Sequence, residues 1–417
     1  MTVKKMIAYQ VVAVIVMLLG AEGLARIAYT FHEANKPTAQ ETWATRTPDL
    51  GWERRRNFNG PDICGVPRTF DASGLVPSDA AQLEEKKPGQ QTALFIGDSR
   101  TYGFCVDAES TFVEVADRAL PQFRMINLGV AGYTTYQGYK TLLKHGDTYK
   151  PNVVFVSFNF NDRRYVVDEN DIDSDAVFER LAQPAVRGFL EEVYLFRLAK
   201  FLSVKVRGLP DEAAGRGGLA RLDVMRPRVD AHAYKANLVN IVRWARERGS
   251  SVFFILLGDN PNETALLRKG VGDLEQENFP AAIDAFDNLM RRPRTAFAQM
   301  GQLYLSKTYA KMGQHEQAEK LLWADTLFSA HGGHPLVPDT DYSRVMRKVA
   351  DEYGIPLIDA QSALEKTPRV FFDSSHFDAE GHEIVGNLVA NALKGQTSFA
   401  ARHPDEREFK AQAPAAP

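Results

Sequence analysis

The sequence predicts an α/β fold in which a parallel sheet lies between layers of helices, with a helical insertion and an N-terminal apolar helix added to it. Short apolar runs typical of buried strands recur along the chain, at 92–98, 124–129, 153–158, 251–257 and 356–359. Amphipathic runs of helical length alternate with them, at 110–120, 134–146, 231–248 and 340–354. Strands that alternate with helices are typical of a parallel sheet covered on both faces.

The first strand ends in a motif that suits a nucleophile. The apolar run Leu94–Gly97 is followed at once by Asp98 and Ser99. Buried parallel strands are continuous apolar runs, and open α/β sheets bind ligands at the carboxyl ends of their strands. Ser99 is therefore expected at the functional edge of the sheet, where the chain turns into a helix. Gly-Asp-Ser is also ordinary turn composition, so the motif alone decides nothing.

Three further segments carry residues of matching chemistry. Gly132 follows the second strand, and Asn161 and Asp162 follow the third. Asp373 and His376 lie near the C-terminus, just before a helical run. Each segment has an ordinary structural alternative, since Gly132 could be a plain turn glycine and Asn161 with Asp162 could cap a helix. The functional prediction rests on the ordered set of four segments.

Together these residues resemble the four blocks of the SGNH (GDSL-type) hydrolase superfamily, over about 92–260 and 340–394. In that family the blocks carry Ser in Gly-Asp-Ser, a Gly, Asn in G-x-N-D, and Asp and His in D-x-x-H. The resemblance implies a flavodoxin-like three-layer sandwich with a five-stranded parallel sheet. One departure is visible: Asn161 is kept, but Asn159 stands where the family usually has Gly, which leaves the local backbone geometry open.

The four blocks supply the groups that ester cleavage needs. A serine hydroxyl is a poor nucleophile unless a base takes its proton, and His376 is the candidate base for Ser99. Asp373, three residues before it, would fix the imidazole tautomer and stabilise the imidazolium. The oxyanion donors are expected to be the N–H groups of Ser99 and Gly132 and the side-chain amide of Asn161.

The remaining polar residues near the motifs are expected to be structural. Asp98 should orient the loop of the nucleophile, and His382 should pack within the terminal helix. Arg100 is expected at the surface, with contact to an anionic or sugar group as the alternative. The sequence contains no metal-ligand cluster, Walker loop or dinucleotide fingerprint, so no cofactor is predicted.

The first 31 residues are expected to anchor the protein in a membrane. Lys4 and Lys5 precede the apolar run Met6–Gly20, and apolar character continues to residue 31. A charged start before an apolar core is typical of a secretory signal, and the lysines would keep the N-terminus in the cytoplasm. We therefore predict a single-pass inner-membrane protein with a periplasmic catalytic domain. Cleavage of the signal near Ala25 is the alternative.

The rest of the chain divides into five segments. Residues 32–90 are polar and rich in turn residues, and are expected to form an extracytoplasmic spacer and a wrapping segment. The hydrolase domain is expected at 91–258 and 339–395, with a helical insertion at 259–338 between its two parts. Residues 396–417 are expected to be a disordered tail.

The insertion is expected to be a tetratricopeptide-like repeat. Phe279–Phe286 and His315–Leu322 align at a spacing of 36 residues, close to the period of such repeats. Gly313 lies at the turn between helices, with Tyr309 before it and Ala318 after it. A generic helical hairpin is the alternative. Because so few repeats rarely fold alone, the insertion should pack on the hydrolase core and either shape the cleft or hold a protein partner.

The composition of the chain limits the kinds of partner that are expected. The net charge of −3 carries no basic signature of nucleic-acid binding. The only cysteines are Cys64 and Cys105. In an exported protein these two can form a disulfide, and the alternative is a pair of buried free thiols.

Three functions follow in order of preference. The first is an extracytoplasmic serine esterase that cleaves a carboxylic ester, such as an acylated glycan, through an acyl-Ser99 intermediate. The second is an O-acyltransferase that passes the same acyl group to a cell-surface polysaccharide, as the resemblance to anchored SGNH proteins of bacterial surface-polysaccharide acetylation implies. The third is an inert scaffold whose helical repeat recruits a protein partner.

Overall fold

The computed structural model describes residues 17, 20–24, 26, 43–47, 49–62, 64–76, 89–166, 226–292, 296–323, 336 and 340–395. Most of the predicted membrane anchor and all of the predicted C-terminal tail lie outside these residues. Among the residues described, no helix has the length and apolar character needed to cross a membrane.

Five strands form the central sheet: β5 (Gln91–Gly97), β6 (Phe123–Asn127), β7 (Val153–Ser157), β10 (Ser251–Leu256) and β11 (Leu357–Asp359). Their order is β11-β10-β7-β5-β6, and every neighbouring pair is parallel. Numbered along the chain, this is the flavodoxin-like order 2-1-3-4-5. This topology confirms the predicted parallel sheet. Its strands could be located from the sequence because each one is a buried apolar run bounded by turns.

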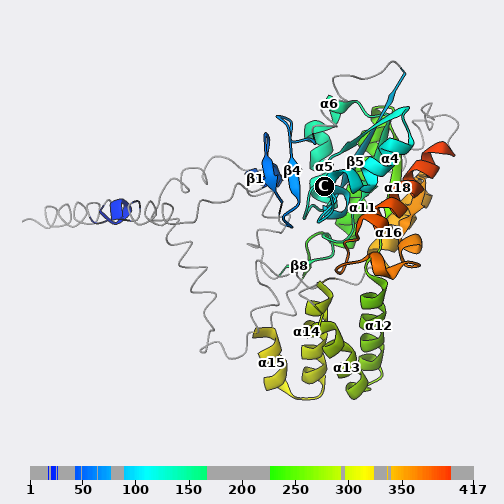
Figure 1. The fold of residues 1–417 in the computed structure, drawn as a ribbon. Helices are drawn as coiled ribbons and strands as arrows, with labels where there is room; N and C mark the ends of the chain where they lie inside the picture. Colours follow the sequence, from blue (N-terminus) through cyan, green and yellow to red (C-terminus); the bar gives the residue numbers. More distant parts are fainter. Residues whose placement is uncertain are drawn as a thin grey trace, which may run out of the picture.

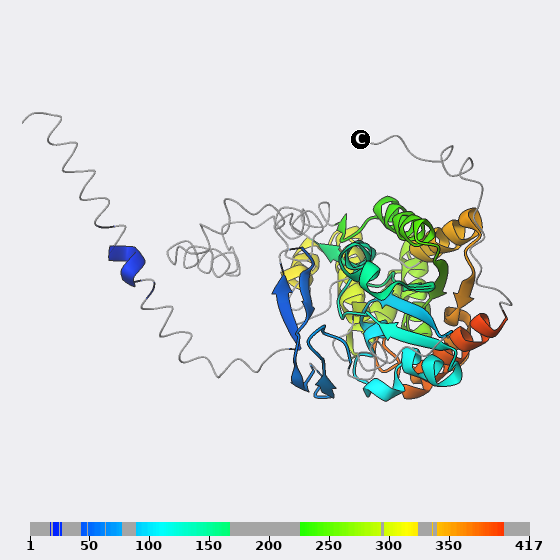
Figure 2. The same cartoon turned by 90° about the horizontal axis from the view of Figure 1, so that it is seen from above.

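Helices cover both faces of the sheet (Figure 2). One layer contains α5 (Thr135–Thr141), α11 (Ala231–Glu247) and α16 (Thr340–Tyr353), and the other contains α4 (Phe112–Ala119), α17 (Ala360–Leu364) and α18 (Ala379–Lys394). Successive strand residues point to opposite faces. In β5, Leu94 and Ile96 pack in the core of the first layer, and Ala93 and Phe95 pack in the core of the second.

Several of these helices begin at a capping side chain, which satisfies a free N–H of the first turn. The Asp230 carboxylate accepts from the N–H of Ala233 at 2.8 Å to start α11, and Asp378 accepts from the N–H of Gly381 at 3.1 Å to start α18. The described part of the domain also contains short elements: η1 (Ala108–Ser110), the π-helical turn η2 (Leu142–Gly146), α6 (Asp147–Tyr149), β8 (Tyr165–Val166), β9 (Arg226–Pro227) and η3 (Pro368–Val370).

Two antiparallel hairpins that precede the sheet in the sequence lie beside the hydrolase domain (Figure 1). They are β1 (Ala44–Thr47) with β2 (Gly51–Arg54), and β3 (Asn59–Pro61) with β4 (Pro67–Thr69). We call residues 43–76 the wrapping segment. Its Phe58 and Phe70 form a small apolar core with Tyr102 of the hydrolase domain.

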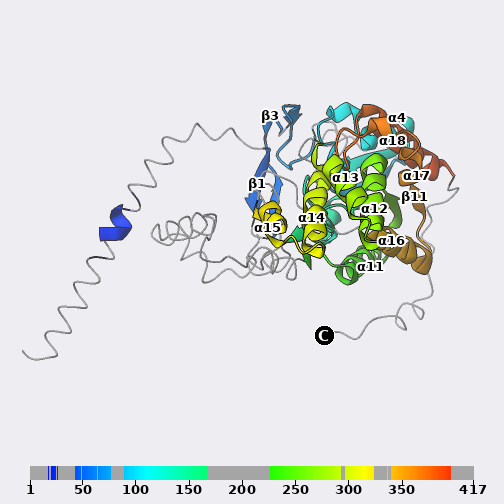
Figure 3. The ribbon, with the colours of Figure 1, turned by 90° about the horizontal axis from the view of Figure 1, so that it is seen from below.

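Four helices lie between β10 and α16: α12 (Pro261–Glu275), α13 (Phe279–Met290), α14 (Ala296–Lys311) and α15 (His315–Trp323). We call residues 260–323 the helical insertion, which includes Asn260, the N-cap of its first helix. It forms two helix–turn–helix units, which lie below the hydrolase domain in Figure 1 and in front of it in Figure 3. Each unit turns at a residue of positive φ, Glu277 (59°) and Gly313 (77°). The core of the insertion includes Phe286 and Met300, and Phe160 of the hydrolase domain packs against it.

Candidate active site

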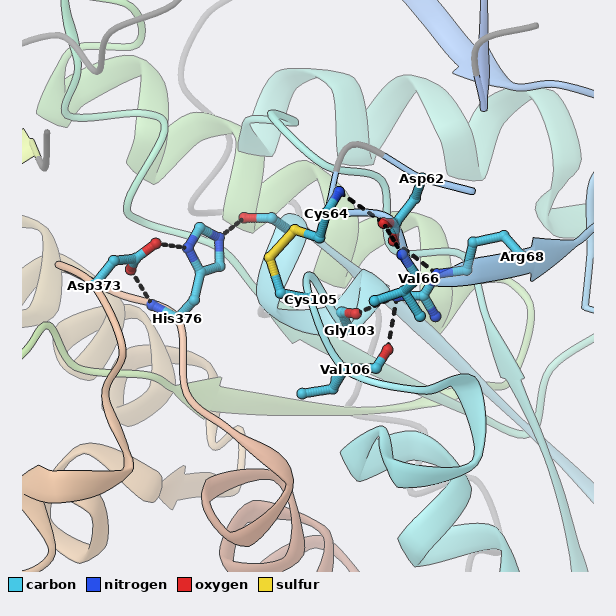
Figure 4. Close-up of a disulfide and its surroundings, with 10 residues drawn as sticks. Asp62, Cys64, Val66, Arg68, Gly103, Cys105, Val106, Asp373 and His376 are labelled. Carbon is cyan, nitrogen blue, oxygen red and sulfur yellow. Dashed lines mark hydrogen bonds and ion pairs between the residues drawn. A yellow bond between two sulfur atoms is a disulfide. The ribbon is translucent and has the colours of Figure 1, made fainter. Parts of the chain in front are cut away.

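The structure places Ser99, His376 and Asp373 in one hydrogen-bonded line, and Figure 4 shows how Asp373 faces His376. The Oγ of Ser99 lies 2.7 Å from Nε2 of His376, and Nδ1 of His376 lies 2.6 Å from Oδ2 of Asp373. These are the contacts that a nucleophile, a base and an orienting carboxylate require. The sequence places the serine 277 positions from the histidine, so the fold alone brings them together.

The position of Ser99 follows from the end of β5. The strand stops at Gly97, and the short helix α3 (Ser99–Tyr102) begins directly after it. Asp98 caps this helix by accepting from the N–H of Arg100 at 3.0 Å. A Cβ on Gly97 would lie 1.9 Å from Oγ1 of Thr101, so only glycine allows this sharp turn from strand to helix.

The loop between η3 and α18 holds Asp373 and His376. An antiparallel bridge between Phe371 and Phe377 closes it. The second carboxylate oxygen of Asp373 accepts from the backbone N–H groups of Ser375 and His376, both at 2.8 Å. Burial alone would raise the pKa of Asp373, but the His376 ring and these N–H groups outweigh it and hold the pKa below its usual value. Asp373 is therefore ionised at neutral pH.

Two of the three expected oxyanion donors, those of Gly132 and Asn161, lie at or beside the loop after β6. The N–H of Ser99 lies at the first position of α3, where a helix offers no acceptor. Gly132 has a φ of 86°, and a Cβ there would lie 2.9 Å from Trp52. The side-chain amide of Asn161 donates to the carbonyl oxygen of Tyr133 at 3.1 Å. Gly132 and Asn161 thus meet through Tyr133, and the glycine is required by both its backbone angle and its neighbour.

The expectation that Arg100 lies at the surface is wrong. Its side chain is 2% exposed. It forms an ion pair with Asp98 at 2.7 Å and donates to the carbonyl oxygen of Leu257 at 3.3 Å and to Oδ1 of Asn159 at 3.4 Å. The departure from the family pattern at Asn159 is thereby explained: its φ is not positive, so no glycine is needed, and its amide joins this buried network.

Asp162 and His382 have structural roles. The Asp162 carboxylate accepts from the N–H and the hydroxyl of Thr135, at 2.9 and 2.5 Å, and so caps α5 from another loop. Burial raises the pKa of Asp162 to about 6. His382 accepts from the N–H of Phe112 at 3.1 Å, and burial lowers its pKa to about 3. His382 is therefore neutral and buried, as its predicted packing role requires.

The wrapping segment contacts the loop that carries Gly132, which sequence reasoning missed. Arg54 donates to the carbonyl oxygen of Gly129 at 2.5 and 3.0 Å and to Oδ1 of Asn127 at 3.2 Å. Trp52 donates from its indole N–H to the carbonyl oxygen of Ala131 at 2.9 Å. Arg54 is buried, and these contacts span more than 70 positions, so no local pattern could have shown them.

The helical insertion contacts the other catalytic loop. Asn260, the N-cap of α12, donates from its backbone to the carbonyl oxygen of Ser374 at 2.8 Å and from its side chain to that of Asp373 at 3.1 Å. The N–H of Phe297 in α14 donates to Oγ of Ser374 at 3.3 Å. Glu263 is buried and hydrogen-bonded to Ser374. Burial raises the pKa of Glu263, and the Ser374 contact partly offsets this shift.

Cys64 and Cys105 form a disulfide that joins the wrapping segment to the loop after α3 (Figure 4). Their Cα atoms are 5.2 Å apart. Within the ranges that the structure describes, no cluster of three or more His, Cys, Asp or Glu side chains is placed to hold a metal ion.

A family comparison identifies the class. The model of the GDSL-like Lipase/Acylhydrolase family matches residues 95–384, a range that includes all five residues of the candidate triad and oxyanion site. The chain belongs to this family and is a serine ester hydrolase. The predicted family membership and enzyme class are confirmed.

The chain is also similar, at low identity, to several solved structures. A G-D-S-L family lipolytic protein from Veillonella parvula shares 10% identity over 73% of this chain and 99% of its own, with a TM-score of 0.36. A lipase/acylhydrolase from Enterococcus faecalis shares 16% identity over 73% and 96%, with a TM-score of 0.36. An acetylxylan esterase from Geobacillus stearothermophilus shares 14% identity over 76% and 99%, with a TM-score of 0.34. No curated protein matches the chain.

Proposed function

We propose that this protein hydrolyses a carboxylic ester through an acyl-Ser99 intermediate. The observation that carries the proposal is the continuous line of hydrogen bonds from Ser99 through His376 to Asp373. A scaffold without catalytic activity would have no need to keep three polar side chains in this alignment, so the inert alternative is not favoured.

The proposed reaction has two steps. Oγ of Ser99 attacks the ester carbonyl while Nε2 of His376 takes its proton, and the bond to the alcohol breaks as His376 returns that proton to the leaving oxygen. Water then attacks the acyl-serine with His376 as base, and the carboxylic acid leaves. The ionised Asp373 stabilises the imidazolium in both steps. The donors of Ser99, Gly132 and Asn161 would stabilise the negative oxygen of each tetrahedral intermediate.

An O-acyltransferase remains the second candidate, and one residue favours a sugar as the alcohol. Phe372 is 45% exposed and its ring stacks near His376, with 5.9 Å between centroids and 12° between planes. His376 would exchange its proton with the alcohol, so this exposed ring borders the place where the alcohol binds. An aromatic face suits the apolar face of a sugar ring. A sugar bound there could be the product alcohol or the acceptor of the acyl group.

We further propose that the catalytic domain is held outside the cytoplasm by the N-terminal segment. The disulfide supports this location, because disulfides persist in oxidising compartments. The tetratricopeptide-like character of the insertion is also a proposal. Its support is the recurrence of a helix, a positive-φ turn and a second helix, with Glu277 and Gly313 at equivalent places 36 residues apart.

Hydrolysis of p-nitrophenyl acetate by the detergent-solubilised full chain tests the proposal. We expect turnover in the wild type and covalent labelling by a fluorophosphonate, with both lost in Ser99→Ala. Turnover at the wild-type rate in Ser99→Ala would refute it. Addition of an oligosaccharide acceptor then separates the two candidates: acyl transfer to the sugar at the expense of free acid would favour the transferase.

A further inference from the structure

The loop Gly103–Val106 touches both the nucleophile and the base. The backbone N–H groups of Gly103 and Phe104 both donate to the carbonyl oxygen of Ser99, each at 3.0 Å. The ring of Phe104 packs on the ring of His376, with 4.4 Å between centroids and 31° between planes. The position of this loop therefore affects the distance between Ser99 and His376, on which proton transfer depends.

The wrapping segment holds this loop by two kinds of bond (Figure 4). The disulfide Cys64–Cys105 is one. The other is the guanidinium of Arg68, which donates to the carbonyl oxygen of Gly103 at 2.5 Å and to that of Val106 at 2.8 Å. We call the Cys64–Cys105 disulfide and the two Arg68 hydrogen bonds together the clamp. The wrapping segment, which supplies Cys64 and Arg68, precedes the residues that match the family, so the clamp is an addition to the hydrolase core.

Arg68 is itself held firmly. It is buried and paired with the buried Asp62 at 2.9 Å. Asp62 also accepts from the N–H groups of Cys64 and Val66, at 2.8 and 3.1 Å. These bonds fix the turn between β3 and β4, which carries Cys64, and so hold this end of the disulfide in place.

The loop adopts a backbone shape that needs such support. Cys105 has a φ of 61°, in the left-handed region that residues other than glycine rarely adopt. Such conformations persist where the surroundings impose them. When the bond to Cys64 is broken, we expect Cys105 to relax and Phe104 to move with it.

We propose that Phe104 is a positioning residue for His376, and that the Cys64–Cys105 disulfide keeps it in place, so that full activity requires the oxidised pair. The inference rests on the proposed hydrolase function. A dithiol reductant would break the S–S bond by exchange: its own two thiols become a disulfide, and Cys64 and Cys105 each become a thiol. The reduced protein keeps the triad residues but loses their alignment.

The test compares the full chain before and after treatment with dithiothreitol, in detergent. We expect kcat for p-nitrophenyl acetate to fall about tenfold with KM nearly unchanged, and the pKa of His376, measured by NMR, to shift. The double variant Cys64→Ser/Cys105→Ser should resemble the reduced wild type and be insensitive to dithiothreitol. Asn59→Ala, an exposed change on the same hairpin that leaves the clamp intact, should behave as wild type in both states.

Phe104→Leu keeps the disulfide and the apolar bulk, so it tests the proposal even if the cysteine variant fails to fold. It should lower kcat and shift the pKa of His376. The inference would be overturned if the oxidised and reduced forms had equal kcat and equal His376 pKa. It would also be overturned if Phe104→Leu left both quantities unchanged. Absence of ester turnover in the oxidised wild type would instead contradict the proposed function, and the His376 pKa would still decide the inference.

Discussion

Two peripheral regions hold the catalytic loops of this hydrolase, and they do so differently. The wrapping segment contacts the loops of Ser99 and Gly132 through two buried arginines and a disulfide. The helical insertion contacts the loop of His376 through a backbone N–H of α14, the amide of Asn260 and the carboxyl group of Glu263, and none of these three groups is a cation. Charged hydrogen bonds contribute about 1.5–3 kcal/mol and neutral ones about 1 kcal/mol.

The difference suggests a division of roles. The side of the site that holds the nucleophile and the oxyanion is fixed by strong contacts, as a preorganised oxyanion site requires. The side that holds the base has the ring contact of Phe104 and weaker hydrogen bonds that run directly to the helical insertion. A structural change in the helical insertion is therefore expected to displace Asp373 and His376 more than Ser99. The following changes test this contrast.

Asp373→Asn should have the largest effect on kcat. The effects of the other changes near His376 are compared with it. The asparagine can still bond to the histidine but favours the wrong tautomer, so kcat should fall by about 10⁴-fold and remain above background. Steady-state hydrolysis of p-nitrophenyl acetate measures this, and circular dichroism checks the fold. A fall of less than tenfold would mean that Asp373 does not orient His376.

Arg54→Ala should have the next largest effect, because it removes the strongest contact between the wrapping segment and the loop of Gly132. The buried carbonyl oxygen of Gly129 loses its charged donor, which should cost about 2–3 kcal/mol of unfolding free energy. We expect kcat to fall about tenfold or more as the oxyanion loop loosens. Urea unfolding and ester turnover measure the two effects.

Arg56→Ala is the matched control, since Arg56 is exposed two positions away. It should change the unfolding free energy by less than about 0.5 kcal/mol. Equal effects of the two variants would remove the special role assigned to the Arg54 contact.

Ser374→Ala should have a smaller effect, because the hydroxyl group that it removes is uncharged, whereas Arg54→Ala removes a buried guanidinium. The N–H of Phe297 and the Glu263 carboxyl group both lose their Ser374 partner. We expect kcat to fall about threefold to tenfold, near the 1 kcal/mol of one neutral hydrogen bond. Asn262→Ala, on the exposed side of α12, should be silent. An effect of Ser374→Ala larger than that of Arg54→Ala would reverse the contrast between the two regions.

Phe372→Ala should have the smallest effect on small esters. The exposed ring would contact the alcohol rather than the reacting atoms, so kcat for p-nitrophenyl acetate should change less than threefold. KM for an acetylated oligosaccharide should rise severalfold. Leu143→Ala serves as the control, because it removes a side chain of similar exposure (48%) at a position distant from Phe372 in the sequence. Unchanged KM for the sugar ester would exclude Phe372 from the alcohol site.

The sequence was informative where local pattern determines structure. Apolar runs located the five strands, because burial on both faces requires them. The family blocks predicted that Ser99, His376 and Asp373 lie together, and hydrogen bonds join these three side chains in the structure. The helices at 279–286 and 315–322 followed from their shared spacing, and the structure places α13 and α15 there.

It was uninformative where contacts join distant segments. Arg100 was expected at the surface because arginine is rarely buried, yet it is buried and donates to the carbonyl oxygen of Leu257, 157 positions away. Arg54 reaches Gly129 across 75 positions, and Phe297 reaches Ser374 across 77. Nothing in the local composition of either pair indicates the contact. The mechanical connection of both peripheral regions to the catalytic loops became visible only in three dimensions.

The central claim is that Ser99 is the nucleophile of a serine ester hydrolase held by its two peripheral regions. Mass spectrometry of the full chain, quenched during turnover of p-nitrophenyl acetate and digested, tests it most directly. The account predicts an acetyl group on the peptide that contains Ser99 in the wild type and none in Ser99→Ala. Acetylation of a different residue during productive turnover, or undiminished turnover in Ser99→Ala, would contradict it.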